Sequence, residues 1–100
     1  MSKKNKKIIK LCGVKHEIFE DSMTGNLDAM GRWHEMDSKI IVNSKLNKSL
    51  KKAVLWHEVV HVVLEGIGES ELSKNEDFVD KLAKTLNQCA KLKIKKVKRK

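Results

Sequence analysis

The most constraining feature of the sequence is an apolar stretch from Leu50 to Gly66 that encloses the motif His57-Glu58-Val59-Val60-His61. Apart from the three polar residues of the motif, every residue from Ala53 to Leu64 is apolar. No Gly or Pro interrupts the stretch, and it is too long for an ordinary strand, so the pattern predicts a helix that begins near Leu50. Asn47 or Ser49 can cap its start, and Gly66 and Gly68 provide its end. A helix that is apolar on all sides is buried. We therefore expect this helix at the centre of a small fold.

The two histidines of the motif are spaced to act together. Residues four apart on a helix differ by about 40° in direction and about 6 Å in height, so His57 and His61 point the same way. Burial of these rings without partners would be costly, and either a metal ion or a polar cluster in the core could satisfy them. Zinc suits imidazole nitrogen, and a catalytic zinc takes three protein ligands and leaves a fourth position for water. Glu58 lies close enough to take a proton from that water. We predict one zinc ion here.

A third ligand is available in the segment that follows. Glu76 and Asp80 are four residues apart and face the same way on a second predicted helix. Glu76 could bind the metal while Asp80 accepts the other ring N–H of one histidine, and Asn75 could do the same for the other histidine. Without a metal, Glu76 is the capping-box partner of Ser73. Asp80 is then a surface acid paired with Lys84.

The rest of the chain predicts a small sheet. Residues 8–19 contain two strand-like runs separated by Gly13, and residues 32–43 resemble a hairpin around a turn at 37–38. Residues 21–31 are rich in turn residues and predict a loop. The expected fold is α+β, with a small twisted, mostly antiparallel sheet of three to four strands. This sheet packs on the helix of the HExxH motif and on a following helix that runs from Ser73 to about Leu92.

Five further residues carry weaker expectations. His16 falls in a strand-like run and is expected to be a solvated surface residue. Cys12 and Cys89 have no metal-type spacing and are expected to be buried free thiols in a reducing compartment. Trp33 and Trp56 are expected to pack in the core or at its rim.

The net charge of +9 is unevenly distributed. The first ten and last ten residues together carry twelve basic residues and no acid, whereas residues 11–90 carry a net charge of −3. The basic residues therefore belong to the ends of the chain. They could contact nucleic acid or another polyanion nonspecifically, or they could serve solubility alone.

The length of 100 residues predicts a single domain over 1–100, with basic, mobile tails at 1–7 and 93–100. The longest apolar run is too short to span a bilayer. No apolar segment follows the basic N-terminal residues as it would in a secretory signal. We expect a cytoplasmic protein without a membrane partner.

The motif HExxH followed by NExxxD resembles the gluzincin clan of zinc metallopeptidases, whose thermolysin-like members carry the third zinc ligand on a glutamate helix. The resemblance covers roughly residues 31–90. It implies a zincin-like fold, a general base at Glu58 and a protein or peptide substrate. The residues implied as zinc ligands are His57, His61 and Glu76, and those implied to lie beside them are Asp80, which orients the first histidine, and Asn75.

The arrangement is also similar to small metallopeptidase-like proteins of bacteriophages and prophages, and more loosely to the ImmA/IrrE type. A phage-encoded protein of this kind would act in the host cytoplasm. Fuller gluzincins stabilise the oxyanion with a tyrosine or a downstream histidine, but this chain has no Tyr and no His after His61. His34 and Arg32, on a predicted edge strand, are the candidate substitutes. An extended peptide substrate would pair with that strand.

Three interpretations remain open at this point. The first is a zinc-dependent metallopeptidase. The alternative is a noncatalytic, zinc-stabilised regulatory module of phage type that contacts a host protein or nucleic acid. The third is a latent, zymogen-like form in which a terminal segment covers the metal. Glu58 favours the enzyme, because a structural zinc needs only ligands and closes its fourth position.

Overall fold

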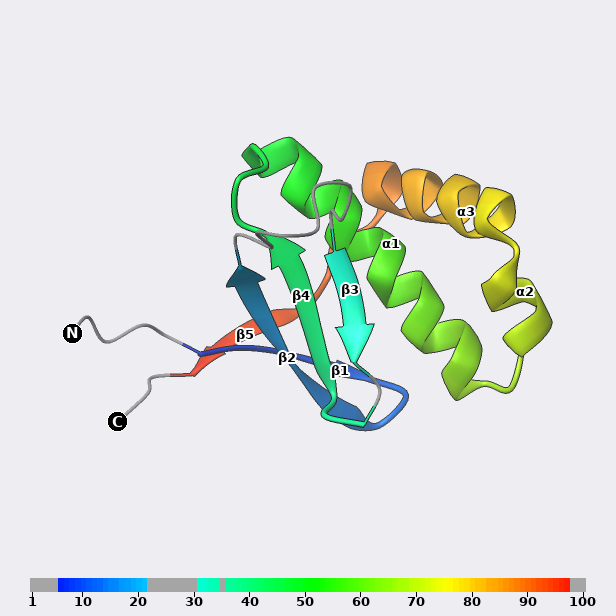
Figure 1. The fold of residues 1–100 in the computed structure, drawn as a ribbon, viewed down its shortest axis with the longest axis horizontal. Helices are drawn as coiled ribbons and strands as arrows, with labels where there is room; N and C mark the ends of the chain where they lie inside the picture. Colours follow the sequence, from blue (N-terminus) through cyan, green and yellow to red (C-terminus); the bar gives the residue numbers. More distant parts are fainter. Residues whose placement is uncertain (1–5, 22–30, 35, 98–100) are drawn as a thin grey trace.

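A five-stranded sheet with helices packed on one face makes up the computed structural model, which describes residues 6–21, 31–34 and 36–97 (Figure 1). The strands are β1 (Lys6–Leu11), β2 (Val14–Asp21), β3 (Gly31–His34), β4 (Lys39–Asn43) and β5 (Ile94–Val97). The helices are α1 (Lys48–Gly66), α2 (Ser70–Lys74) and α3 (Glu76–Cys89). The α+β prediction is confirmed, with one strand more than the three to four expected. The loop expected over 21–31 falls almost entirely outside the described residues.

The strand order is β3-β4-β2-β1-β5, so β3 and β5 are the edges of the sheet. The pair β2–β4 is parallel, and the other pairs are antiparallel. Cys12 and Gly13, with φ of 51° and 80°, form the two-residue turn between β1 and β2, and left-handed residues at both positions are typical of such hairpins. The predicted hairpin over 32–43 is confirmed, with Trp33 opposite Ile40.

The hydrophobic core lies between the sheet and α1, and α3 packs on the other side of α1 (Figure 1). Alternation along the strands turns Ile9, Ile40 and Val42 toward α1. Trp56 is buried, as expected. His16 is also buried, at 4% exposure, so the prediction of a surface histidine is wrong. Its run carries apolar side chains on both faces of the strand, and the alternation alone did not identify the buried face. The helices contribute Val54, Leu55, Trp56, Val59, Val60, Val62, Leu64, Val79 and Ala83 to the core.

The N-terminus of α1 is capped by Asn47, whose side-chain oxygen accepts a hydrogen bond from the Leu50 backbone N–H at 2.9 Å. Asn47 was one of the two expected caps. The helix therefore begins at Lys48, two residues earlier than predicted. It ends at Gly66, and Gly68 follows with φ of 83°. The predicted position of the helix end is confirmed.

The segment after α1 differs from the prediction. The second helix was expected to begin at Ser73, but residues 70–74 form the separate short helix α2. The N-cap of α3 is Asn75, whose side-chain oxygen accepts from the Phe78 N–H at 3.1 Å. The capping box of Ser73 with Glu76 is therefore wrong, because Asn75 takes the capping position. The helix ends at Cys89 rather than near Leu92.

The basic ends of the chain meet at one side of the sheet. β5 pairs with β1, placing Lys7 opposite Lys96 and Ile8 opposite Lys95 (Figure 1). Residues 94–97 are thus strand rather than tail, because pairing satisfies backbone groups of β1 that would otherwise lie at an open edge. Residues 1–5 and 98–100 lie outside the described residues.

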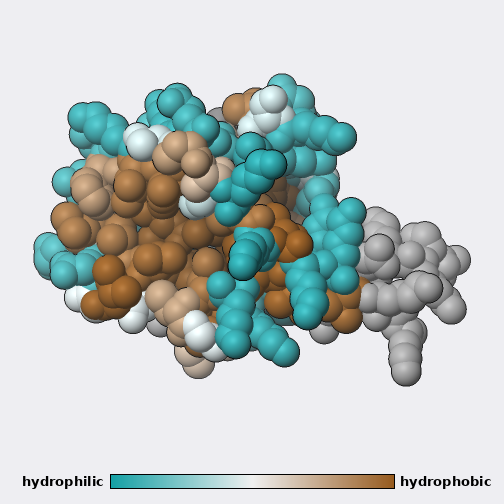
Figure 2. Space-filling view, turned by 180° about the vertical axis from the view of Figure 1, so that it is seen from behind, coloured by the Kyte–Doolittle hydropathy of each residue, from teal (hydrophilic) through white to brown (hydrophobic). Residues whose placement is uncertain are grey.

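The surface carries two further features. Cys12 and Cys89 are free, as expected, but both are exposed rather than buried, because a turn and the last turn of a helix hold them outside the core. Figure 2 shows a broad hydrophobic area over the helical layer, bordered by hydrophilic side chains. Within the part of the chain that the structure describes, no helix is long and apolar enough to cross a membrane.

Candidate metal centre

The candidate site lies where α3 packs against α1. His57 and His61 lie one turn apart on α1, with ring centroids 4.9 Å apart. Glu76 is the first residue of α3. The chain turns back after Gly66, and α2 carries it to the side of α1 on which the two imidazoles lie. Packing of the two helices therefore brings Glu76 to both histidines.

The distances suit a shared metal ion. His57 Nε2 lies 3.1 Å from Glu76 Oε1, and His61 Nε2 lies 3.4 Å from Glu76 Oε2. One ligand atom from each of the three residues lies within 4.8 Å of the others. Ligands at about 2.0–2.1 Å from a tetrahedral zinc would be separated by roughly 3.3 Å. These three residues could therefore hold a metal ion with both histidines facing it through Nε2.

The other ring nitrogen of each histidine has a partner on α2 or α3. His61 Nδ1 lies 3.0 Å from the hydroxyl oxygen of Ser73, which is only 4% exposed. His57 Nδ1 lies 4.0 Å from Asp80 Oδ1, and the second oxygen of Asp80 pairs with Lys84 at 3.0 Å. With Nε2 turned to a metal, Nδ1 of His61 would keep its ring proton and donate a hydrogen bond to the Ser73 oxygen, which orients that ring. Asp80 lies beyond hydrogen-bond distance of His57 Nδ1 and acts on that ring through its charge.

The partners of the histidines agree only partly with the sequence-based expectations. Asp80 lies beside His57, on the expected helix face. Asn75 does not take the role expected for it, because its side-chain oxygen caps α3. Ser73 lies against His61 instead, and the sequence analysis missed this role. A serine among exposed polar residues gives no local signal of burial, and only the turn of α2 places it here.

Glu58 lies next to the histidines on α1 and is partly buried. Burial raises the pKa of its carboxyl above the usual value, the charges of His57 and His61 act to lower it, and Glu76 acts to raise it. A side chain at Gly31 would lie 3.6 Å from Glu58 Cγ. The first residue of β3 is thus next to the candidate general base. A carboxylate with a raised pKa is a better proton acceptor, as a general base requires.

The site remains open to solvent on the side of Glu76. The side chain of Glu76 is 68% exposed, and those of His57 and His61 are 27% and 17% exposed. A molecule from solution can therefore reach the position between the three side chains.

Arg32 and His34, the candidates for oxyanion stabilisation, both lie on the edge strand β3, as expected. Successive side chains of a strand point to opposite faces. Gly31 lies against α1 and Trp33 is paired with the fully buried Ile40, so Arg32 and His34 face the other side of the sheet. Strand geometry thus separates these two side chains from Glu58.

No protein-family model matches the chain, and neither the curated proteins nor the solved structures give a match. The functional interpretation therefore rests on the geometry of the site.

Proposed function

We propose that the protein is a zinc-dependent metallopeptidase that hydrolyses a peptide bond in a protein or peptide. The observation that carries this proposal is the convergence of His57, His61 and Glu76, with Glu58 beside them and outside the ligand group. The mixed imidazole and carboxylate donors favour zinc. Three protein ligands leave one tetrahedral position free, which is the arrangement of catalytic rather than structural zinc.

When bound, zinc supplies Lewis-acid chemistry, which acidifies water and polarises a carbonyl group. Within the proposal, Ser73 holds the His61 imidazole in place through Nδ1, and the negative charge of Asp80 favours the His57 orientation that turns Nδ1–H toward it. Glu58 removes the proton of the attacking water and returns it to the leaving amine. Its partial burial and raised pKa suit both steps.

The edge strand β3 supports binding of an extended peptide. It pairs with β4 on one side and is the last strand of the sheet on the other. A peptide can add to such an edge through backbone hydrogen bonds. Because Gly31 at the start of β3 lies against Val54 and Glu58, a peptide on this edge would pass close to the site.

The test of this proposal is the substitution Glu58→Gln, which keeps the shape of the side chain and removes the base. We expect zinc content to be unchanged and peptide hydrolysis to fall by about 10²–10⁴-fold, the usual contribution of a general base. The measurement is cleavage of a peptide library followed by mass spectrometry. Equal rates for the variant and the unaltered chain would refute the proposed mechanism.

A second candidate function is contact with a polyanion such as nucleic acid, as a noncatalytic module. The pairing of β1 with β5 favours it, because Lys7 lies directly opposite Lys96. Like charges opposite each other destabilise a strand pair. Bound phosphates would relieve this repulsion.

A further inference from the structure

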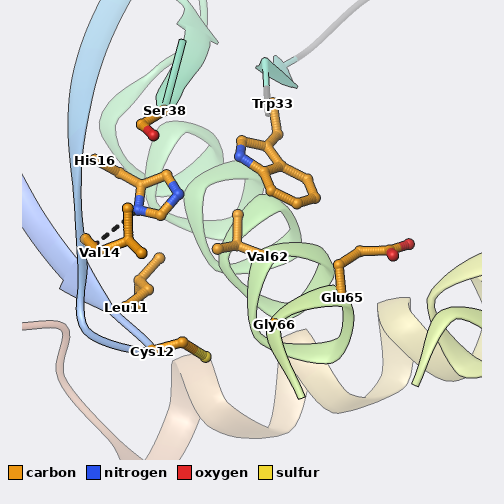
Figure 3. A pocket seen from close by; sticks show the side chains of 9 residues that line it. All are labelled: Leu11, Cys12, Val14, His16, Trp33, Ser38, Val62, Glu65 and Gly66. Carbon is orange, nitrogen blue, oxygen red and sulfur yellow. Dashed lines mark hydrogen bonds between the residues drawn. The ribbon is translucent and has the colours of Figure 1, made fainter. Parts of the chain in front are cut away.

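A second concave site lies beside the metal centre. It is a pocket of about 240 Å³ between the C-terminal end of α1 and the turns that join β1 to β2 and β3 to β4 (Figure 3). It contains none of the metal ligands. Val62, which directly follows His61, and Glu65, one turn further along α1, both line it, so the two sites are adjacent.

His16 presents a hydrogen-bond acceptor to this pocket. Its Nδ1 lies 3.1 Å from the carbonyl oxygen of Val14. A carbonyl oxygen only accepts, so Nδ1 carries the proton, and in the neutral ring Nε2 offers a lone pair. Figure 3 shows this nitrogen turned toward Trp33. His16 is 96% buried, and among the described residues no protein group pairs with Nε2.

Trp33 presents a donor to the same space. Its indole nitrogen is buried, and within the described ranges no protein atom accepts its proton. The rings of His16 and Trp33 are tilted by 54°, with centroids 6.4 Å apart, and the indole nitrogen lies on the side of the ring that faces His16 (Figure 3). An unpaired buried donor is unfavourable. A water-sized group does not reach the indole nitrogen in the structure, so the Trp33 ring must shift slightly to admit a ligand. One hydroxyl group then satisfies both, because its oxygen accepts from the indole and its proton is donated to Nε2.

The remaining walls select for a neutral, largely apolar group. Leu11, Val14 and Val62 provide apolar contacts. An apolar cavity of about 150 Å³ holds benzene, so a pocket of about 240 Å³ has room for a phenol ring. Glu65 also lines the pocket, and its carboxylate accepts a hydrogen bond from Ser70 at 2.9 Å. This negative charge disfavours an anionic ligand.

We propose that this pocket binds the phenol side chain of a tyrosine in the peptide substrate, with the hydroxyl group between His16 and Trp33. That the group belongs to a substrate rests on the proposed peptidase function. The path of the peptide follows from the position of β3, an edge strand of the sheet. Gly31, the first residue of β3, lies against Glu58, and Trp33 follows two residues later. A peptide bound along β3 would pass both the metal centre and the pocket.

The test uses the full chain and two side-chain analogues, p-cresol for tyrosine and toluene for phenylalanine. The chain has two tryptophans, so its ¹H–¹⁵N spectrum has two indole N–H resonances, and the buried, unpartnered indole of Trp56 is an internal control outside the pocket. We expect p-cresol to shift the Trp33 resonance saturably and to leave that of Trp56 in place. Toluene should bind at least about tenfold more weakly, since it leaves buried polar groups unpaired.

Two matched tryptophan variants test the contribution of the Trp33 indole N–H donor. Trp33→Phe keeps an aromatic ring and removes the N–H, and should weaken p-cresol binding about 3- to 10-fold, as read from the backbone amide of Gly66 in the pocket wall. Trp56→Phe should leave the affinity unchanged. If Trp33→Phe does not fold, the comparison of p-cresol with toluene on the unaltered chain decides.

Three results would overturn the pocket assignment. They are an unmoved Trp33 resonance at saturating p-cresol, equal affinity for p-cresol and toluene, and equal effects of the two tryptophan substitutions. None of these binding measurements depends on hydrolysis. Failure of the Glu58→Gln test would therefore refute the peptidase proposal separately, without changing the p-cresol result.

Discussion

The substitution Ser73→Ala tests how the protein orients His61, one of the three candidate metal ligands. Ser73 is 4% exposed, and its hydroxyl oxygen lies 3.0 Å from Nδ1 of His61. Alanine would remove this hydrogen-bond acceptor. Because the His61 side chain is only 17% exposed, water could replace the lost acceptor only incompletely. Loss of such an orienting partner typically weakens metal binding about 10- to 100-fold, which corresponds to about 1.4–2.7 kcal/mol.

The assay is competition for zinc between the protein and a chromogenic chelator of known affinity. Ser70→Ala is the matched control, because Ser70 lies on the same short helix and bonds Glu65 rather than a ligand. We expect its zinc affinity to change less than about twofold, since exposed hydrogen bonds contribute little. Circular dichroism below the unfolding transition establishes that both variants are folded. A folded Ser73→Ala protein with unchanged zinc affinity would refute the role given to Ser73.

Two further predictions concern the start of α3 and the basic edge of the sheet. Asn75→Ala should lower the free energy of unfolding by about 1 kcal/mol, because the α3 cap is lost. Urea denaturation measures this change. An unchanged unfolding midpoint would contradict the assignment of Asn75 as the cap. If the strands β1 and β5 bind nucleic acid, affinity for a single-stranded DNA oligonucleotide should fall steeply with salt, and Lys96→Glu should weaken binding more than the control Lys52→Glu, which lies on α1. Salt-independent affinity, or equal effects of the two lysine substitutions, would argue against that contact.

The local features of the fold were largely predictable. The helix around His57 and His61, its cap at Asn47 and its end at Gly66 follow from periodicity, capping chemistry and glycine conformation. The hairpin that contains Trp33 and Ile40 follows from two strand patterns around a turn. Each of these signals lies within a short window of sequence, where neighbouring residues decide the backbone conformation.

The nonlocal features could not be predicted in the same way. The parallel pairing of β2 with β4 and the addition of β5 to β1 join segments that are distant in the sequence, and nothing in either strand alone identifies its partner. The burial of His16 and Ser73 has the same cause. Ser73 is buried where α2 packs against His61 of α1, and the ring of His16 lies beside Trp33 of β3.

For the candidate site, the sequence spacing predicted the residues but not their support. The positions of His57, His61 and Glu76 follow from helix geometry, once the two helices are assumed to pack together. The contact of His61 with Ser73, and the turning of Arg32 and His34 to the other side of the sheet, depend on how α2 and β3 are placed.

The most direct test of the central proposal is the zinc content of the purified protein, measured by elemental mass spectrometry for the unaltered chain and for Glu76→Ala. We predict one zinc ion per chain, and a variant that remains folded but binds zinc much more weakly. A folded, unaltered protein that binds no zinc when zinc is supplied would contradict the account, as would a Glu76→Ala variant with undiminished zinc affinity.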